Sequence, residues 1–218
     1  MARLDELVAD REVKVCVFRG LPNVFCAGAH KDLLLDLAEG SSLPTDIRLS
    51  GMLLDVPIPT IAAMEGHAVG GGLSLALCCD MVLMARESRY GCSFMNMGFT
   101  PGMGITRLLQ DAVGEHIAAE MMFGGQMFKG AHFEQRSKIN YVLPKAQVLR
   151  KAMSVARRIA EKPRGAVELL KRSLSVRRRQ AFEEARTVEA MMHKLSFADP
   201  ETKQRIQENY ARSRKEQK

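Results

Sequence analysis

Short apolar runs separated by turns and helical segments organise the first part of the chain. Valines alternate with other side chains within residues 13–18, and this pattern predicts a strand that ends before Arg19-Gly20. Residues 60–64 and 81–84 are short apolar runs that predict two further buried strands. Because helical segments lie between these strands, the sequence predicts an α/β fold with parallel pairing.

Leucine-rich and amphipathic segments predict the helices. In the first part of the chain they cover residues 3–10, 31–37, 47–54, 73–79 and 105–109. After Pro144 strand signals almost disappear, and helices are expected over residues 147–161, 165–173 and 180–195. Asp199-Pro200 predicts a break before a charged amphipathic tail. We therefore expect an α/β core over residues 1–145 and a helical region over residues 146–218.

Composition narrows the class of protein without identifying it. The 218 residues carry 32 Lys+Arg against 25 Asp+Glu, and 46% are hydrophobic, which is typical of a globular chain that buries a core without disulfides. No apolar run approaches the roughly 18 residues that cross a bilayer. The five cysteines form no CxxC pair, so we expect reduced thiols, no metal site and a cytoplasmic location.

Two segments of small residues are candidates for chemistry. Cys26–Ala29 and Gly70–Gly72 each follow a predicted strand and precede a predicted helix, so each can present an unpaired backbone N–H. Two such donors directed at one point would stabilise negative charge on an acyl oxygen. Taken alone, either segment fits close packing of helix on strand better than it fits a site. The second segment lacks the Lys-Ser/Thr of a phosphate-binding loop.

Taken together, three stretches carry a resemblance: PNVFCAGAHKDLL, PTIAAMEGHAVGGGLSLALCCDMVLMARES and FTPGMGITRLL. In order and spacing they resemble the enoyl-CoA hydratase (crotonase) family, over roughly residues 10–197. The resemblance implies a spiral of β-β-α units with a C-terminal helical trimerisation region, in a homotrimer or a hexamer. It also implies an oxyanion hole in which the amides of Ala29 and Gly71 hold a thioester oxygen. The β-hairpin with which most members begin is not evident in this sequence.

The departures from the hydratase pattern are informative. Hydratases of the family use two glutamates to position and activate water, and the corresponding positions here are Ser74 and Phe94. Neither side chain can act as a carboxylate general acid or base. The sequence therefore predicts enolate chemistry at a thioester without hydration.

One subgroup is especially similar. RESRYGCSFMNMGFTPGMG and MMHKLSF resemble the second enoyl-CoA-hydratase-like protein of polyketide β-branching cassettes. That resemblance implies decarboxylation of a 3-methylglutaconyl group carried on the phosphopantetheine of an acyl carrier protein, with no further cofactor and a 3-methylcrotonyl-type product. By the same resemblance His193 is the expected catalytic histidine, which binds the carboxylate or protonates the dienolate. Lys31 is a second catalytic candidate, although it does not align securely and a solvated role fits it as well.

Further residues are expected around the acyl group. Phe94, Met95, Ser74 and Tyr90 are candidates for the substrate pocket, with Met97 extending its apolar wall. An apolar wall would disfavour the charged ground state relative to a delocalised transition state. His30 and His67 are expected to cap or to position turns.

The stretch from Arg157 to Arg186 contains ten Lys/Arg and four Asp/Glu. It fits a solvated helical face, or docking of an acidic acyl carrier protein. Nucleic-acid binding is disfavoured, because the charge is diffuse and no aromatic stacking residues accompany it. Two alternatives to the decarboxylase remain open: another glutamate-less crotonase, such as a double-bond isomerase or thioester hydrolase on acyl-CoA, and an inactive scaffold.

Overall fold

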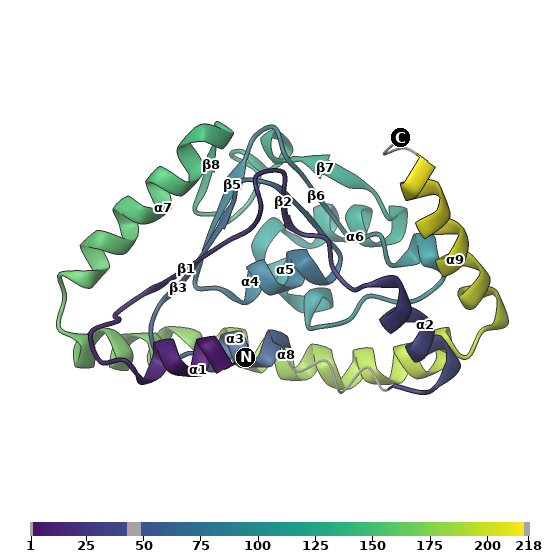
Figure 1. Ribbon diagram of the computed structural model, residues 1–218, viewed down its shortest axis with the longest axis horizontal. Helices are drawn as coiled ribbons and strands as arrows, with labels where there is room; N and C mark the ends of the chain where they lie inside the picture. Colours follow the sequence, from purple (N-terminus) through teal and green to yellow (C-terminus); the bar gives the residue numbers. More distant parts are fainter. Residues whose placement is uncertain (1, 43–48, 216–218) are drawn as a thin grey trace.

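Strands β1 to β6 alternate between two four-stranded sheets in the computed structural model, which describes residues 2–42 and 49–215 (Figure 1). The first sheet has the order β1 (Cys16–Arg19), β3 (Thr60–Met64), β5 (Met81–Ala85), β8 (Tyr141–Leu143). The second has the order β2 (Val24–Cys26), β4 (His67–Val69), β6 (Arg89–Gly91), β7 (Met127–Lys129). All pairs are parallel except β6 with β7. The chain therefore winds as a spiral, and the predicted α/β class is confirmed.

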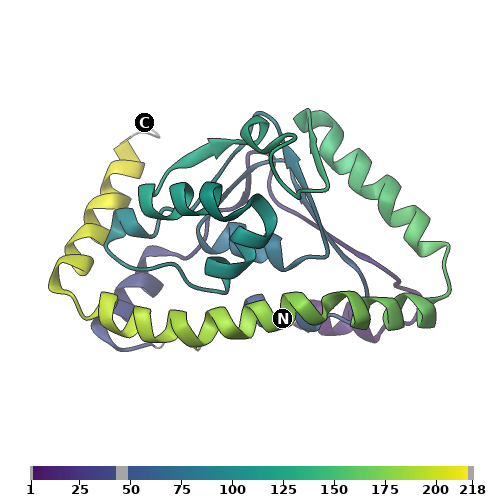
Figure 2. The ribbon, with the colours of Figure 1, turned by 180° about the vertical axis from the view of Figure 1, so that it is seen from behind.

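Helices fill the turns of this spiral and then form its C-terminal region. Those within the spiral are α1 (Ala2–Ala9), α2 (Lys31–Glu39), α3 (Leu49–Asp55), α4 (Gly71–Cys78), α5 (Ile105–Val113) and α6 (Glu115–Gly124), with 3-10 turns η2 (Met95–Met97) and η3 (Gly130–Phe133). The C-terminal helices are α7 (Lys145–Ala160), α8 (Arg164–Phe197) and α9 (Pro200–Lys215). Helix α8 runs along one side of the molecule, with α7 and α9 rising from its two ends (Figures 1 and 2).

Strand β3 shows how the sequence pattern builds the core. Its five residues are all buried, and successive side chains point to opposite faces of the sheet. Ala62 and Met64 join the main core around α4, whereas Ile61 and Ala63 pack against α7. This two-sided burial explains why the run is continuously apolar rather than alternating.

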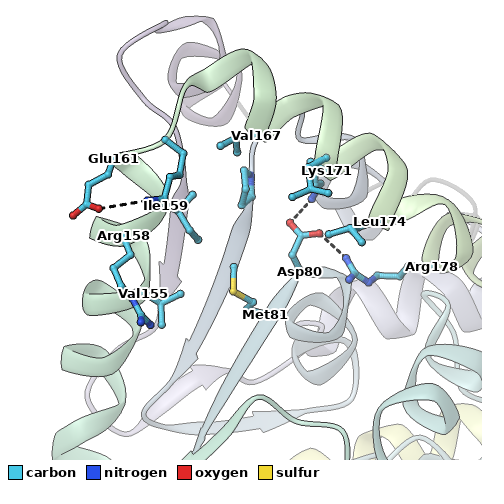
Figure 3. A pocket seen from close by; sticks show the side chains of 13 residues that line it. Asp80, Met81, Val155, Arg158, Ile159, Glu161, Val167, Lys171, Leu174 and Arg178 are labelled. Carbon is cyan, nitrogen blue, oxygen red and sulfur yellow. Dashed lines mark hydrogen bonds and ion pairs between the residues drawn. The ribbon is translucent and has the colours of Figure 1, made fainter.

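A partly buried ion cluster fastens α8 to the sheet (Figure 3). The Asp80 carboxylate pairs with Lys171 and, at 2.8 Å, with Arg178, and it also accepts hydrogen bonds from the amide and hydroxyl of Thr60. Desolvation acts to raise the pKa of Asp80, but these partners together hold it below its ordinary value. The cluster ties the C-terminal helices to the start of β5.

Two expectations about elements need correction, and a third lies partly outside the described residues. The helices expected over residues 165–173 and 180–195 are one continuous helix of 34 residues, because the polar segment between them contains no Gly or Pro and is held by Arg178 to Asp80. The strand expected over residues 13–18 begins at Cys16. Of the helix expected over residues 47–54, the first two positions lie outside the described residues. Among the described residues, no helix is long and apolar enough to span a membrane.

Candidate active site

A cavity of about 70 Å³ lies where the two small-residue segments meet the C-terminal helices. Ala29 and Gly71 line it from the spiral, and His193 and Tyr210 line it from α8 and α9. Its walls are mainly apolar and include the side chains of Leu34, Leu37, Phe94, Met97, Phe99 and Phe197. The structure thus brings together groups far apart in the chain, such as Ala29 and Tyr210, which are 181 residues apart.

Glycines allow the two backbone segments to approach each other. Gly28 has a φ of +84°, and a β-carbon there would lie 2.9 Å from the Val69 carbonyl oxygen and 3.5 Å from the Gly71 nitrogen. Gly71 is the first residue of α4, where helix geometry leaves the N–H without an intrahelical acceptor. Among the described residues, neither Ala29 nor Gly71 donates its N–H to a backbone carbonyl. Two amides are therefore free to bind an oxygen at this cavity.

His193 lies on the buried face of α8 and is 9% exposed. Its Nε2 lies 2.9 Å from the carbonyl oxygen of Thr100. Because a carbonyl only accepts, we assign the proton of the neutral ring to Nε2. The imidazole packs edge-on against the rings of Phe99 and Phe197, with centroids 6.5 and 5.4 Å away. Gly102 leaves room for the ring, since a β-carbon there would lie 2.1 Å from its Cε1.

Burial lowers the pKa of His193 below its ordinary value. The hydrogen bond to Thr100 and the negative charge of Glu189 oppose this effect in part. At neutral pH the free protein therefore holds a mostly neutral imidazole, whose remaining nitrogen, Nδ1, has a lone pair.

Glu189 precedes His193 by one helical turn and is 2% exposed. Its Oε2 accepts from the Gly104 amide at 2.7 Å, and its Oε1 accepts from the amide and hydroxyl of Thr106 at 3.0 and 2.7 Å. These bonds cap the start of α5 and hold the loop over residues 99–104 against α8. Both oxygens of this carboxylate therefore accept hydrogen bonds from the protein.

Ser74 and Phe94, at the positions that correspond to the two hydratase glutamates, have different roles in this protein. Ser74 is fully buried, and its hydroxyl donates to the Met103 carbonyl at 2.6 Å, which anchors the same loop from α4. Ser74 is not among the residues that line the cavity. Phe94 does line it, and its ring packs edge-on against Phe99 with centroids 5.9 Å apart. None of the described lining residues is acidic.

The structure places three other expected site residues away from the cavity. Tyr90 is fully buried in the core, where its hydroxyl donates to the Met64 carbonyl at 2.7 Å. Met95 is 40% exposed, because η2 turns Met97 inward in its place. Lys31 opens α2 and is only partly buried; Leu34 and Leu37 are the residues of that helix that reach the cavity.

The remaining expectations for single residues fall on structural positions. Nδ1 of His30 accepts from the amide of Asp32 at 3.4 Å and caps α2, and Nδ1 of His67 accepts from the amide of Arg89 at 2.8 Å. The five cysteines are free thiols. Burial raises the pKa of Cys79 and of Cys92 to about 12, so neither thiol is ionised near neutrality.

Sequence analysis missed Glu189 and Tyr210. The spacing of four between Glu189 and His193 on one helix was an available signal for the first. No signal in the charged tail distinguishes Tyr210, because only the folding of α9 back onto α2 brings it to Ala29.

Comparison with known proteins agrees with the geometry. The enoyl-CoA hydratase/isomerase family model matches residues 1–217. The bacillaene synthase decarboxylase PksI of Bacillus subtilis is 38% identical over 90% of this chain and 79% of its own length. A solved structure of a dehydratase/decarboxylase enzyme couple of polyketide β-branching is similar at 36% identity and a TM-score of 0.89, over 94% of this chain and 81% of that one. The structure of the ECH2 decarboxylase domain of CurF from Lyngbya majuscula is similar at 34% identity and a TM-score of 0.88, over 95% of this chain and 85% of that one. The chain belongs to the enoyl-CoA hydratase/isomerase family.

Proposed function

We propose that this protein is a decarboxylase that converts a 3-methylglutaconyl thioester, carried on an acyl carrier protein, into a 3-methylcrotonyl-type thioester. One observation carries the proposal: the cavity joins two free amides to His193, and none of its described lining residues is acidic. The similarity to decarboxylases of polyketide β-branching supports the same reaction.

The amides of Ala29 and Gly71 form the oxyanion hole of the proposed reaction. The bond between the carboxylate and C4 breaks, and its electrons move through the conjugated system to the thioester oxygen as CO2 leaves. The resulting dienolate places negative charge on that oxygen, where the two N–H groups donate to it. Loss of one such donor typically costs about 3 kcal/mol of transition-state stabilisation. No base is needed to start the reaction.

His193 supplies the proton that the reaction consumes. In the free protein Nε2–H is engaged by Thr100, so Nδ1 must take up a proton before it can bind a carboxylate. The negative charge of the substrate favours that uptake, because an opposite charge close to the ring raises the pKa of the imidazole. After CO2 has left, Nδ1–H lies beside the carbon that carried it. Proton transfer to that carbon gives the α,β-unsaturated product.

The apolar wall favours loss of charge from the carboxylate. Phe94, Phe99 and Phe197 offer no hydrogen bond to a carboxylate, whereas the dienolate spreads its charge toward the amides. A glutamate at position 94 would repel the carboxylate of the substrate. Phenylalanine at this position therefore suits a reaction in which the charge of one carboxylate becomes a delocalised dienolate, and it excludes the water activation of a hydratase.

Self-association and carrier docking belong to the same proposal. Exposed apolar residues lie in two groups on α8, and within each group the residues that we call the α8 seam are three or four positions apart, as in paired helices: Leu170 and Leu174 in the first, Val188, Met191 and Leu195 in the second. Beside it, between α7 and α8, lies a mainly apolar cavity of about 610 Å³ (Figure 3). Exposed apolar surface of this kind is typical of an interface. We propose that the seam forms a homotrimer.

Only some of the basic residues between Arg157 and Arg186 are available to dock an acidic carrier protein. Arg178 binds Asp80, and Arg179 binds Asp55 and the Leu54 carbonyl, so both arginines serve the fold. Arg157 and Arg172 are exposed and form no ion pair within the described part of the chain. We propose that such unpaired arginines meet the carrier protein.

The test is incubation with 3-methylglutaconyl carried on an acyl carrier protein, followed by the intact mass of the carrier. Loss of CO2 from the acyl group supports the decarboxylase. Loss of the whole acyl group from the carrier would indicate a hydrolase. An unchanged mass would indicate an inactive scaffold, and an acyl group heavier by one water would indicate a hydratase.

A further inference from the structure

One polar group of the cavity has no role in the reaction described above. Helix α2 turns only leucines, Leu34 and Leu37, to the cavity. The titratable side chains among the described lining residues are His193 and Tyr210. Both come from the C-terminal helices, and Tyr210 remains to be explained.

The Tyr210 hydroxyl donates to the Ala29 carbonyl oxygen at 2.7 Å. Ala29 is the residue whose N–H forms half of the proposed oxyanion hole. The carbonyl of Ala29 shares a rigid peptide plane with the N–H of His30, one residue after the Ala29 N–H. Fixing this carbonyl limits rotation about ψ of Ala29 and thereby restrains the backbone next to its nitrogen. Burial raises the pKa of Tyr210, so the phenol keeps its proton and remains a donor.

Helix α9 does not depend on this hydroxyl for its docking. Thr202 donates to the carbonyls of Gly98 at 3.0 Å and Ser196 at 2.8 Å, and Ile206 is fully buried. Lys203 pairs with Glu39 at the end of α2, at 2.7 Å. With these contacts in place, the hydroxyl of Tyr210 adds a bond to the oxyanion segment beyond what anchoring of the helix needs.

We propose that Tyr210 is a positioning residue, which orients the Ala29 amide toward the thioester oxygen from the C-terminal helix. Its catalytic consequence rests on the proposed function, whereas its effect on the bound carbonyl does not. In this proposal α9 supports the oxyanion hole through Tyr210. Without α9, the spiral would hold the Ala29 segment less firmly than the complete protein does.

Tyr210→Phe removes the hydroxyl and keeps the ring. The first readout is the carbonyl stretching frequency of a bound, unreactive butyryl-pantetheine thioester labelled with ¹³C at the carbonyl, since amide donors polarise that bond. The second is kcat for decarboxylation of the carrier-bound substrate. We expect a smaller downward shift of the frequency and a kcat lower by about fivefold to tenfold, the worth of one neutral hydrogen bond, with KM nearly unchanged.

Two control variants separate positioning from packing. Tyr141→Phe makes the same change on β8, where Lys151 lies over the ring, and should leave both readouts at the wild-type value. Lys203→Ala loosens α9 without touching the hydroxyl, and it should change the melting temperature but not the carbonyl frequency. A Tyr210→Phe protein with wild-type frequency and kcat would overturn the proposal, as would an equal frequency change in Lys203→Ala. If wild type binds the thioester but does not decarboxylate, the proposed function fails while a Tyr210→Phe frequency change still supports this inference.

Discussion

Nε2 of His193 lies 2.9 Å from the carbonyl oxygen of Thr100, a contact that fixes which ring nitrogen is available to a substrate. Thr100 belongs to the loop that Ser74 and Glu189 anchor through Met103, Gly104 and Thr106. The loop, the two small-residue segments and the C-terminal helices thereby form one connected frame around the cavity.

The first prediction concerns the pH dependence of catalysis. Because burial holds the pKa of free His193 below 6.5, its catalytic cationic form is scarce at neutral pH. We expect kcat/KM to rise as pH falls from 8 and to level off below the pKa of the free enzyme. Steady-state rates across this range test the expectation. A rate that falls steadily as pH decreases from 8 to 6 would contradict a proton-carrying role.

The same shift has a consequence for stability. The folded state favours the neutral imidazole, so the stabilisation from His193 is fully present above pH 6.5 and is lost as pH falls toward the lowered pKa. We expect His193→Gln to lose less stability than wild type between pH 7 and pH 5. Chemical denaturation at several pH values measures this difference. Parallel losses in the two proteins would assign the acid sensitivity to other groups.

Glu189→Gln tests the anchor of the loop. The NH2 group of Gln only donates, so it cannot replace one of the two carboxylate oxygens as an acceptor. A donor of Gly104 or Thr106 then loses its partner, at a cost of about 1–3 kcal/mol of stability. The missing negative charge also removes an influence that raises the pKa of His193, so the pH profile of kcat/KM should move to lower pH. Glu184→Gln, on an exposed position of the same helix, is the matched control. If the pH profile of kcat/KM does not move in Glu189→Gln, Glu189 anchors the loop but does not influence proton transfer by His193.

The α8 seam makes a prediction about assembly. Leu174→Glu combined with Met191→Glu should convert a trimer into monomers, because charges would be buried in the interface. Both residues are exposed in the single chain, so the fold should persist. Light scattering gives the mass, and Ser173→Glu, exposed on the same helix but outside the seam, serves as control. A monomeric wild-type protein at micromolar concentration would refute the seam as a trimer interface.

Carrier docking can be tested on the exposed arginines. Reversing Arg157 and Arg172 to Glu should raise KM for carrier-bound substrate and spare activity on a small pantetheine thioester. Arg178→Glu is expected to lower stability instead, since it removes a partner of the partly buried Asp80. Equal KM values before and after the double reversal would place the docking surface elsewhere.

His193 carries the mechanistic prediction. His193→Ala should lower kcat by about 10²–10⁴, the usual range for a general acid. His193→Gln retains a hydrogen-bond donor but no transferable proton, so it should recover binding better than turnover. His116→Ala, on the exposed surface of α6, should leave kcat unchanged. Wild-type decarboxylation by His193→Ala would refute the role and turn attention to Lys31.

Local patterns were sufficient to predict much of the fold. The apolar run of β3 and the glycines before α4 specify their elements because the controlling interactions lie within a few residues. The length of α8 was underestimated, since its middle turns are held by Asp80, about ninety residues earlier in the chain. Periodicity within a helix does not show such a partner.

Part of the candidate site could also be predicted from the sequence. Ala29, Gly71 and Phe94 lie at the cavity because the motifs that contain them are contiguous in sequence. Tyr90 and Met95 belong to the same stretch, but strand direction and the turn η2 point them elsewhere. Tyr210 and Glu189 act through contacts to distant backbone groups, which only the three-dimensional arrangement reveals.

The central claim is that CO2 leaves to give a dienolate that takes up one proton. The most direct measurement is the intact mass of the carrier after wild-type enzyme has converted 3-methylglutaconyl-carrier protein in D2O. The account predicts loss of CO2 and gain of a single non-exchangeable deuterium, located on the carbon that had carried the carboxylate. An acyl group that gains the mass of water, leaves the carrier entirely or remains unchanged would contradict it.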